Sequence, residues 1–240
     1  MARDLLDELR RRPADLVLGD ALMLGALDAS RASGVPYAVL EHFYDEHYRT
    51  ALRGPLGLVL RATGLRPGRS LRDAAVRVVM TLPELDLVRP GGVVRQVGPL
   101  VSWRPRKQCE PTVLVSLSTF GYAGMADRLQ TAVQGCAGLP AKAIVTAGPH
   151  IDPDALTAPA GVEVHRFAPH AELMPGVSVL LGHGGHGTAM AALAHDIPVA
   201  GFPLDPKADH EMLGRSLERA GAGRLLRRRA SAHDVRDAVA

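Results

Sequence analysis

The stretch Val177-Ser-Val-Leu-Leu-Gly-His-Gly-Gly-His-Gly-Thr188 decides the fold. It begins with an apolar run of strand length, passes through a glycine-rich turn, and opens an alanine-rich segment of helical character. A strand that leads through such a turn into a helix is typical of an α/β domain with a parallel sheet. The amides and the dipole at the start of the helix favour an anionic ligand.

The turn can be interpreted in more than one way. Its glycines let the backbone approach phosphate oxygens, His183 can add a donor, and Thr188 can add a hydroxyl. The glycines also satisfy the dinucleotide pattern GxGxxG, with Asp205 about 20 residues further on, so an NAD(P) site is the main alternative. That pattern normally follows the first strand of its domain, whereas at least four strands are expected before this one. A turn that serves packing alone would leave its two histidines unexplained.

The same strand and helix rhythm extends over the rest of the chain. After residue 112 we expect strands at 113–117, 143–146, 162–166, 177–181 and 199–202, with helices at 125–136 and from about residues 186, 209 and 231. This order predicts a Rossmann-like doubly wound domain.

A second βαβ pattern precedes it. An amphipathic helix opens the chain, and strands are expected at 16–18, 37–40, 76–80 and 93–97. Residues 42–69 mix aromatics with Gly and Pro and predict a loop-rich region beside the sheet. Residues 103–111 are polar and bracketed by prolines, as in a linker. The predicted class is α/β, with an incomplete N-terminal domain at 1–103, a linker at 104–111 and a C-terminal domain at 112–240.

Composition excludes several classes of protein. The 240 residues are 47% hydrophobic and carry 28 Lys and Arg against 25 Asp and Glu, a net charge of +3 that does not indicate nucleic-acid binding. Cys109 and Cys136 lie far apart, so neither a disulfide scaffold nor a zinc site is indicated. No apolar run reaches the roughly 18 residues of a membrane span. We therefore expect a soluble, cytoplasmic protein with no membrane or nucleic-acid partner.

Six short motifs carry a resemblance to a known family. In order along the chain they are Phe167-Ala-Pro-His170, Glu172-Leu-Met174, His183-Gly-Gly-His-Gly-Thr188, Leu193-Ala-His-Asp-Ile-Pro198, Asp209-His210 and Gly221-Ala-Gly223. Together they resemble the donor-binding signature of the UDP-glycosyltransferase superfamily, most of all bacterial antibiotic and macrolide glycosyltransferases that act on natural products. The resemblance implies a GT-B fold of two Rossmann-like domains, with the N-terminal one truncated here.

The resemblance also implies a set of donor-binding residues. These stack on the nucleobase (Phe167), read its edge (Ala168), bind the diphosphate (His183, Gly185, His186, Gly187 and Thr188, with Ser118 and Thr119 as a second hydroxyl contact) and hold the sugar (Asp209 and His210). At Ser118 and Thr119 a helix N-cap is the alternative. At Phe167 the alternative is a core position. His210 stands where the family has Gln, two extra residues precede the pair, and Ala191 replaces the usual Glu on the ribose, which favours a deoxyribose donor.

The implied reaction is an inverting, metal-independent transfer from a dTDP-sugar or UDP-sugar to a hydroxyl of a small-molecule acceptor. Asp20 matches the residue that orients the catalytic base in the family, but the matching His is absent. His42, Phe43 and Tyr44 are interpreted as acceptor-pocket residues. Asp152-Pro-Asp154 has the DxD form of a metal site, yet it reads as turn chemistry, so no metal and no cofactor is expected.

Two other functions stay open. Because the catalytic His segment is missing, the chain could be a non-catalytic nucleotide-sugar binder or a partner subunit. The GxGxxG-like turn could instead serve an NAD(P)-dependent oxidoreductase. Homodimer formation and association with a missing N-terminal segment are both compatible with the sequence.

Overall fold

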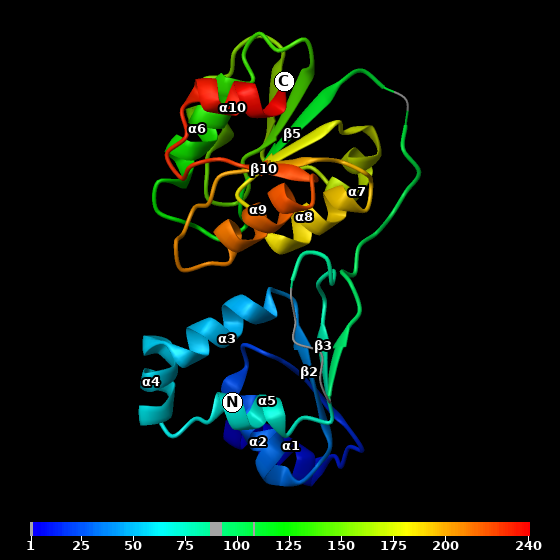
Figure 1. Ribbon diagram of the computed structural model, residues 1–240, viewed down its shortest axis with the longest axis vertical. Helices are drawn as coiled ribbons and strands as arrows, with labels where there is room; N and C mark the ends of the chain where they lie inside the picture. Colours follow the sequence, from blue (N-terminus) through cyan, green and yellow to red (C-terminus); the bar gives the residue numbers. More distant parts are fainter. Residues whose placement is uncertain (1, 87–92, 108) are drawn as a thin grey trace. The chain divides into compact units, whose positions relative to one another are not determined.

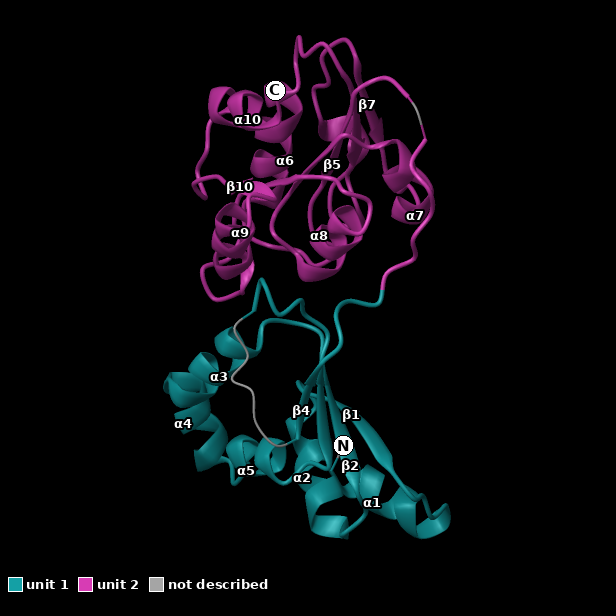
Figure 2. Ribbon diagram, turned by 45° about the vertical axis from the view of Figure 1, so that its right-hand side comes forward, with its two compact units in different colours: residues 1–100 teal, residues 101–240 magenta. Residues whose placement is uncertain are grey.

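The computed structural model describes residues 2–86, 93–107 and 109–240. The chain divides into two compact units, Met1–Leu100 and Val101–Ala240 (Figure 2). Each unit is an α/β layer structure built on its own parallel sheet. No helix within the described residues is long and apolar enough to cross a membrane.

Unit 1 contains a four-stranded sheet in the order β1-β2-β3-β4, and all of its strand pairs are parallel. Its strands are β1 (Val17–Asp20), β2 (Tyr37–Glu41), β3 (Val76–Val79) and β4 (Val94–Gln96). Helices α1 (Ala2–Arg11) and α2 (Leu24–Ser33) complete the first βα units (Figure 1). The four expected strands and the opening helix are thus confirmed.

Residues 42–69 are mostly helical, so the prediction of a loop-rich region was wrong. They form α3 (Asp45–Arg53), α4 (Pro55–Ala62) and, after a turn at residues 63–66, the start of α5 (Pro67–Arg72). Both α4 and α5 begin with proline, which is tolerated at the first helical position because its missing amide hydrogen has no partner there. Each helix is too short for its apolar periodicity to stand out in the sequence.

The corner between α3 and α4 depends on Gly57. A Cβ atom on this residue would lie 1.7 Å from the carbonyl oxygen of Leu52. Only glycine therefore lets the first turn of α4 approach the end of α3 so closely. The close approach packs the start of α4 against the end of α3.

Unit 2 contains a six-stranded parallel sheet in the order β10-β9-β8-β5-β6-β7. Its strands are β5 (Thr112–Ser116), β6 (Lys142–Thr146), β7 (Val162–His165), β8 (Val179–Gly182), β9 (Val199–Gly201) and β10 (Gly223–Leu225). Its helices are α6 (Met125–Gly135), α7 (His170–Leu173), α8 (His186–Leu193), α9 (His210–Arg219) and α10 (Ala232–Val239), with short 3-10 turns at Pro153–Ala155 and Met174–Gly176. The doubly wound domain is confirmed, and β10 is an additional strand.

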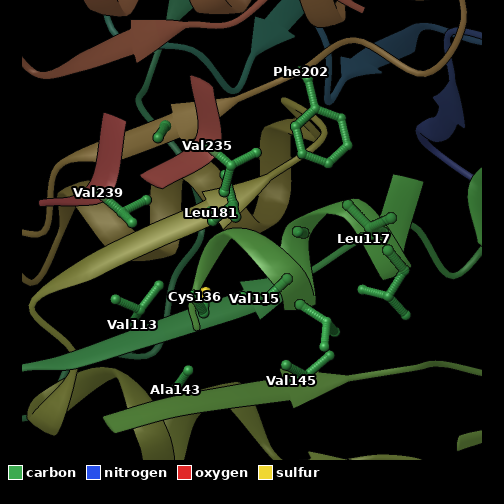
Figure 3. Packing of buried hydrophobic residues seen from close by; sticks show 14 of the residues in the cluster. Val113, Val115, Leu117, Cys136, Ala143, Val145, Leu181, Phe202, Val235 and Val239 are labelled. Carbon is green, nitrogen blue, oxygen red and sulfur yellow. The ribbon is translucent and has the colours of Figure 1, made fainter. Parts of the chain in front are cut away.

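The core of unit 2 is centred on β5, all of whose residues are buried. Figure 3 shows Val113 and Val115 of this strand among side chains from neighbouring strands and from α10. Helices α6 and α10 pack so closely that a Cβ atom on Gly135 would lie 2.4 Å from a methyl group of Val235. A sheet buried on both faces holds the carboxyl ends of its central strands in fixed positions.

The segment that follows Leu100 is attached to unit 2. The indole ring of Trp103 stacks on the imidazole of His195 at a centroid distance of 6.5 Å, and the amide of Arg104 donates to Nε2 of the same histidine at 3.2 Å. Further along, the amide of Lys107 donates to the carbonyl oxygen of Pro175 at 2.7 Å. Residues of the expected linker 104–111 therefore make defined contacts with the second unit.

Candidate functional site

The strand order of unit 2 reverses between β5 and β8. From β5 the chain winds outward through β6 and β7, and it then returns to the other side of β5 as β8. Ser116 and Gly182, the last residues of these two strands, are paired in register. Ligands of open α/β sheets bind outside the carboxyl ends of the strands at such a switch point. The segments Ser118–Thr119 and His183–Thr188 therefore begin at the position where a ligand is expected.

His183 is the buried polar side chain of this turn. It is only 8% exposed, and its ring meets that of His210 edge to face at 4.7 Å. Burial, reinforced by the nearby His210, lowers the pKa of His183 to about 3. The imidazole is therefore neutral at physiological pH and offers one N–H donor without a charge.

The glycines of the turn hold this geometry. Gly184 has a positive φ of 84°, and a Cβ atom on it would lie 2.9 Å from the carbonyl oxygen of His210. A Cβ atom on Gly185, the N-cap of α8, would lie 2.6 Å from the His183 ring. By contrast, no atom lies within 4 Å of a Cβ position on Gly187. The first two glycines are thus required for the path of the chain, and the third leaves open space at the start of α8.

The two hydroxyl residues after β5 lie in a turn and not at a helix N-cap. The Oγ atom of Ser118 is buried and accepts a hydrogen bond from the amide of Phe120 at 2.9 Å, while Thr119 is exposed. The N-cap of the following helix α6 is Gly124. The capping alternative is therefore excluded, and the Ser118 hydroxyl keeps its hydrogen for another acceptor.

The remaining predicted donor residues differ in how exposed they are. Phe167 follows β7 and is 78% exposed, which excludes the core alternative, and Ala168 is half-buried. Asp209 is half-buried at the N-cap of α9, whereas His210 is 5% exposed beneath His183. His210 thus packs against the His183 ring.

Asp20 and His42 meet in unit 1. They stand at the carboxyl ends of the neighbouring parallel strands β1 and β2, with Nδ1 of His42 3.0 Å from Oδ2 of Asp20. The other carboxylate oxygen of Asp20 accepts the amide of Leu22 at 2.8 Å. Both side chains remain partly exposed, at 48% for His42 and 30% for Asp20.

The two aromatic residues expected in an acceptor pocket are less accessible than His42. Phe43 is half-buried and packs edge to face on Tyr48 at 4.9 Å. Tyr44 is 1% exposed at the N-cap of α3. In this structure Tyr44 is therefore a packing residue, and His42 is the member of the trio that can reach a ligand.

The acidic DxD segment is a turn that includes an ion pair. Asp152 binds the guanidinium of Arg166 at 3.2 Å, and Pro153 begins a 3-10 turn. Within the part of the chain that the structure describes, no group of three or more His, Cys, Asp or Glu side chains has an arrangement that could hold a metal ion.

The chain is similar to several known proteins. No family model matches the chain. The 4'-demethylrebeccamycin synthase of Lentzea aerocolonigenes is 29% identical, and the match covers 98% of this chain and 68% of that protein. The solved structure of the glycotransferase of kitacinnamycin has a TM-score of 0.81 at 20% identity, covering all of this chain and 70% of that one. The glycosyltransferase VinC, solved in complex with dTDP, has a TM-score of 0.70 at 21% identity, covering 99% and 65%.

The chain is similar in sequence to antibiotic glycosyltransferases and has the GT-B fold. Nearly all of this chain matches each of these three proteins, and the match spans about two thirds of their own length.

The structure adds one residue to the candidate site. The ring of Tyr122, in the loop after β5, lies 5.6 Å from His210 and 6.3 Å from His183. Burial, together with Asp205 and Asp209, raises the pKa of its hydroxyl. An aromatic residue in the loop of a central strand was the only sequence signal for it, and that signal does not name its partners.

The depressed pKa of His183 predicts a loss of stability in acid. In the unfolded chain His183 should titrate near its ordinary value of 6.5, against about 3 when folded. The unfolded state therefore binds the extra proton first, and stability is lost as the pH falls from about 6.5 toward 3. At pH 5 the loss from this residue is about 2 kcal/mol. Urea unfolding of the parent and of His183→Gln at pH 7.5 and 5.0 tests this, because the variant should lose less stability. Equal losses in the two proteins would contradict the assignment.

Proposed function

We propose that this chain binds the diphosphate of a nucleoside-diphosphate sugar at the turn between β8 and α8, and that the sugar passes to a hydroxyl of a small-molecule acceptor. The observation that carries the proposal is the placement of His183 and the α8 N-terminus at the switch point beside β5. A helix N-terminus stabilises negative charge, and a neutral imidazole adds a directed donor.

The chemistry at this turn follows from the leaving group. As the bond from the anomeric carbon to the diphosphate breaks, negative charge develops on the phosphate oxygens. The amides of Gly185 to Gly187, the Thr188 hydroxyl and the His183 N–H are the donors that we assign to those oxygens. Ser118 and Thr119 approach from the loop after β5, and exposed Phe167 offers a ring for the nucleobase. With these donors in place the proposed transfer requires no metal ion.

The proton of the acceptor hydroxyl needs a base, and we assign Asp20 the orienting role that the resemblance implies. The carboxylate holds Nδ1 of His42, so the other ring nitrogen is left to accept a proton. In this assignment the acceptor hydroxyl attacks the anomeric carbon from the face opposite the diphosphate, which inverts the configuration. His42 thereby takes a more direct part than the acceptor-pocket role that the sequence indicated.

The donor that we propose is a dTDP-sugar, with a UDP-sugar as the second candidate. Ala191 lies in α8 and has no carboxylate to bind a ribose 2′-hydroxyl. UDP therefore gains no advantage from its extra hydroxyl. The complex of VinC with dTDP supports the same choice.

Isothermal titration of the chain with dTDP, UDP and NAD⁺ tests the proposed function. We expect dTDP to bind, UDP to bind no more tightly, and NAD⁺ not to bind. The absence of binding by both diphosphates would reject the nucleotide-sugar site, and binding of NAD⁺ alone would support an oxidoreductase. Donor binding without hydrolysis or transfer of a dTDP-sugar would support a non-catalytic subunit.

A further inference from the structure

Unit 1 contains a cavity of about 750 Å³ that the proposed function does not use. Its walls come from α3, from α4, from α5 with the residue before it, and from strands β3 and β4. Seven of the thirteen lining residues are arginines, and none is an aspartate or a glutamate. A volume of this size is typical of sites for small organic ligands.

Three of the seven arginines have carboxylate partners, which are buried for Arg77 and Arg49 and exposed for Arg72. Arg77 binds Glu41 and Asp45, and Arg49 reaches Asp45 at 3.1 Å. Arg72 lies 3.8 Å from the carboxylate of Asp73. These contacts hold part of the wall in place and neutralise its charge.

The other four arginines give the cavity an uncompensated positive charge. They come from the end of α3, from α4, from the N-cap of α5 and from α5 itself: Arg53, Arg61, Arg66 and Arg69. Within residues 2–86, 93–107 and 109–240, no carboxylate lies within 4.0 Å of their guanidinium nitrogens. Four like charges around one hollow repel one another, so an anion that enters is favoured.

The packing of α4 on α3 places one of these charges. The close approach at Gly57 puts Nη1 of Arg61 only 3.3 Å from the position of a Cβ atom on that glycine. The guanidinium of Arg61 therefore lies over the corner of the two helices. Arg53, at the end of α3, lines the same cavity.

Part of the cavity wall is apolar. Leu52 and Leu71 line it and are 8% and 6% exposed, and both belong to the hydrophobic core of unit 1. Val93 and Val94 contribute a second apolar wall. The cavity thus combines a buried aliphatic surface with a set of bidentate cationic donors.

We propose that this arginine cavity is a binding site for an apolar organic anion, a small molecule with a carboxylate, sulfonate or phosphate on an aromatic or aliphatic body. Arginine forks suit all three acid groups, and the leucine and valine walls take the apolar body. Every lining residue belongs to unit 1, whereas the proposed donor residues belong to unit 2. The site is therefore independent of the nucleotide-sugar proposal.

A pair of fluorescent probes that differ in one sulfonate tests the cavity. The anionic probe is 8-anilinonaphthalene-1-sulfonate, and the neutral probe is N-phenyl-1-naphthylamine, which has the same rings. Each is titrated against the full chain, against Arg61→Gln/Arg66→Gln, and against the control Arg228→Gln/Arg229→Gln. The control removes the same charge from two exposed arginines of unit 2. Circular dichroism establishes that each variant keeps its secondary structure.

We expect the full chain to bind the sulfonate more tightly than the neutral probe. The cavity variant should lose about tenfold or more in affinity for the sulfonate alone, because it lacks two of the guanidinium groups that can donate charge-assisted hydrogen bonds to the acid group. The control should bind as the full chain does. A third variant, Arg61→Lys/Arg66→Lys, keeps the charge but removes the forked donors, and it should bind the sulfonate more tightly than the glutamine variant and less tightly than the full chain. Equal affinity for the sulfonate in the cavity variant and the control, or a parallel loss for both probes, would overturn the proposal. Titration with dTDP should be unaffected in every variant, so the two proposals fail separately.

Discussion

Replacing Arg77 with leucine is expected to lower the free energy of unfolding of unit 1 by about 3–5 kcal/mol. The guanidinium donates from Nε to Oε1 of Glu41 at 2.6 Å and from Nη2 to Oε2 at 2.8 Å, and it also binds Asp45. The side chains of both acids are fully buried. Burial already raises the pKa of Glu41, and Arg77 opposes that shift.

In the variant, Asp45 keeps Arg49 as a partner, whereas Glu41 loses the only ion pair that the described residues provide for it. At neutral pH the Glu41 carboxylate must then either stay charged in the core or take up a proton. The loss of unfolding free energy caused by the substitution should accordingly become smaller as the pH falls toward 4.

Urea unfolding, monitored by hydrogen exchange at the β2 amides, measures this change in unit 1. The triple variant Glu41→Leu/Asp45→Asn/Arg77→Leu is the matched control, because it removes all three charges together and should recover much of the lost stability. A single Arg77→Leu variant within about 1 kcal/mol of the parent would show that the network is not coupled to folding.

Replacing Gly184 with alanine is expected to weaken dTDP binding by about 100-fold or more. The residue has a φ of 84°, which alanine rarely adopts, and the added methyl would lie 2.9 Å from the backbone of His210. The turn must shift to relieve the backbone strain and the close contact, and His183 moves with it. The donor N–H would then no longer point to the diphosphate position that we propose.

Gly187→Ala is the matched control in the same turn. A methyl there meets no atom within 4 Å, and the amide that we assign to the phosphate is retained. Alanine inside the first turn of α8 should add up to about 1 kcal/mol of stability, and dTDP binding should change by less than about tenfold. Titration of both variants with dTDP, together with their urea unfolding curves, tests whether the Gly184 turn binds the diphosphate. Binding by Gly184→Ala as tight as that of the parent would show that the turn is not the diphosphate site.

The strands could be predicted because each combines an apolar run with a turn signal. The segment before Gly182 is such a run, and all of its strand neighbours in unit 2 except β10 were expected. The strand β10 has only three residues, with Arg224 in the middle, so no run stands out. The helices α3 to α5 escaped prediction because proline starts two of them, and proline usually suggests a break.

Some contacts of the candidate site could not be predicted from the sequence, because they join residues from different strands and helices. His183 and the glycines beside it are contiguous, so the sequence alone predicts that they form a turn. The contact between Asp20 and His42 arises from the parallel pairing of β1 with β2, which brings two strand ends together. His210 is buried because the start of α9 packs against the turn that contains His183, and nothing in the residue itself indicates this contact.

Trp103 is the one tryptophan in the sequence, and its stacking on His195 makes it a natural optical reporter. Because Nε2 of His195 accepts from Arg104, its Nδ1–H donates a hydrogen bond to the carbonyl oxygen of Ala191 at 2.8 Å, in the last turn of α8. Through His195 the indole is therefore linked to the far end of the helix whose first turn we assign to the diphosphate. Its emission offers a label-free optical signal from the residues that follow α8.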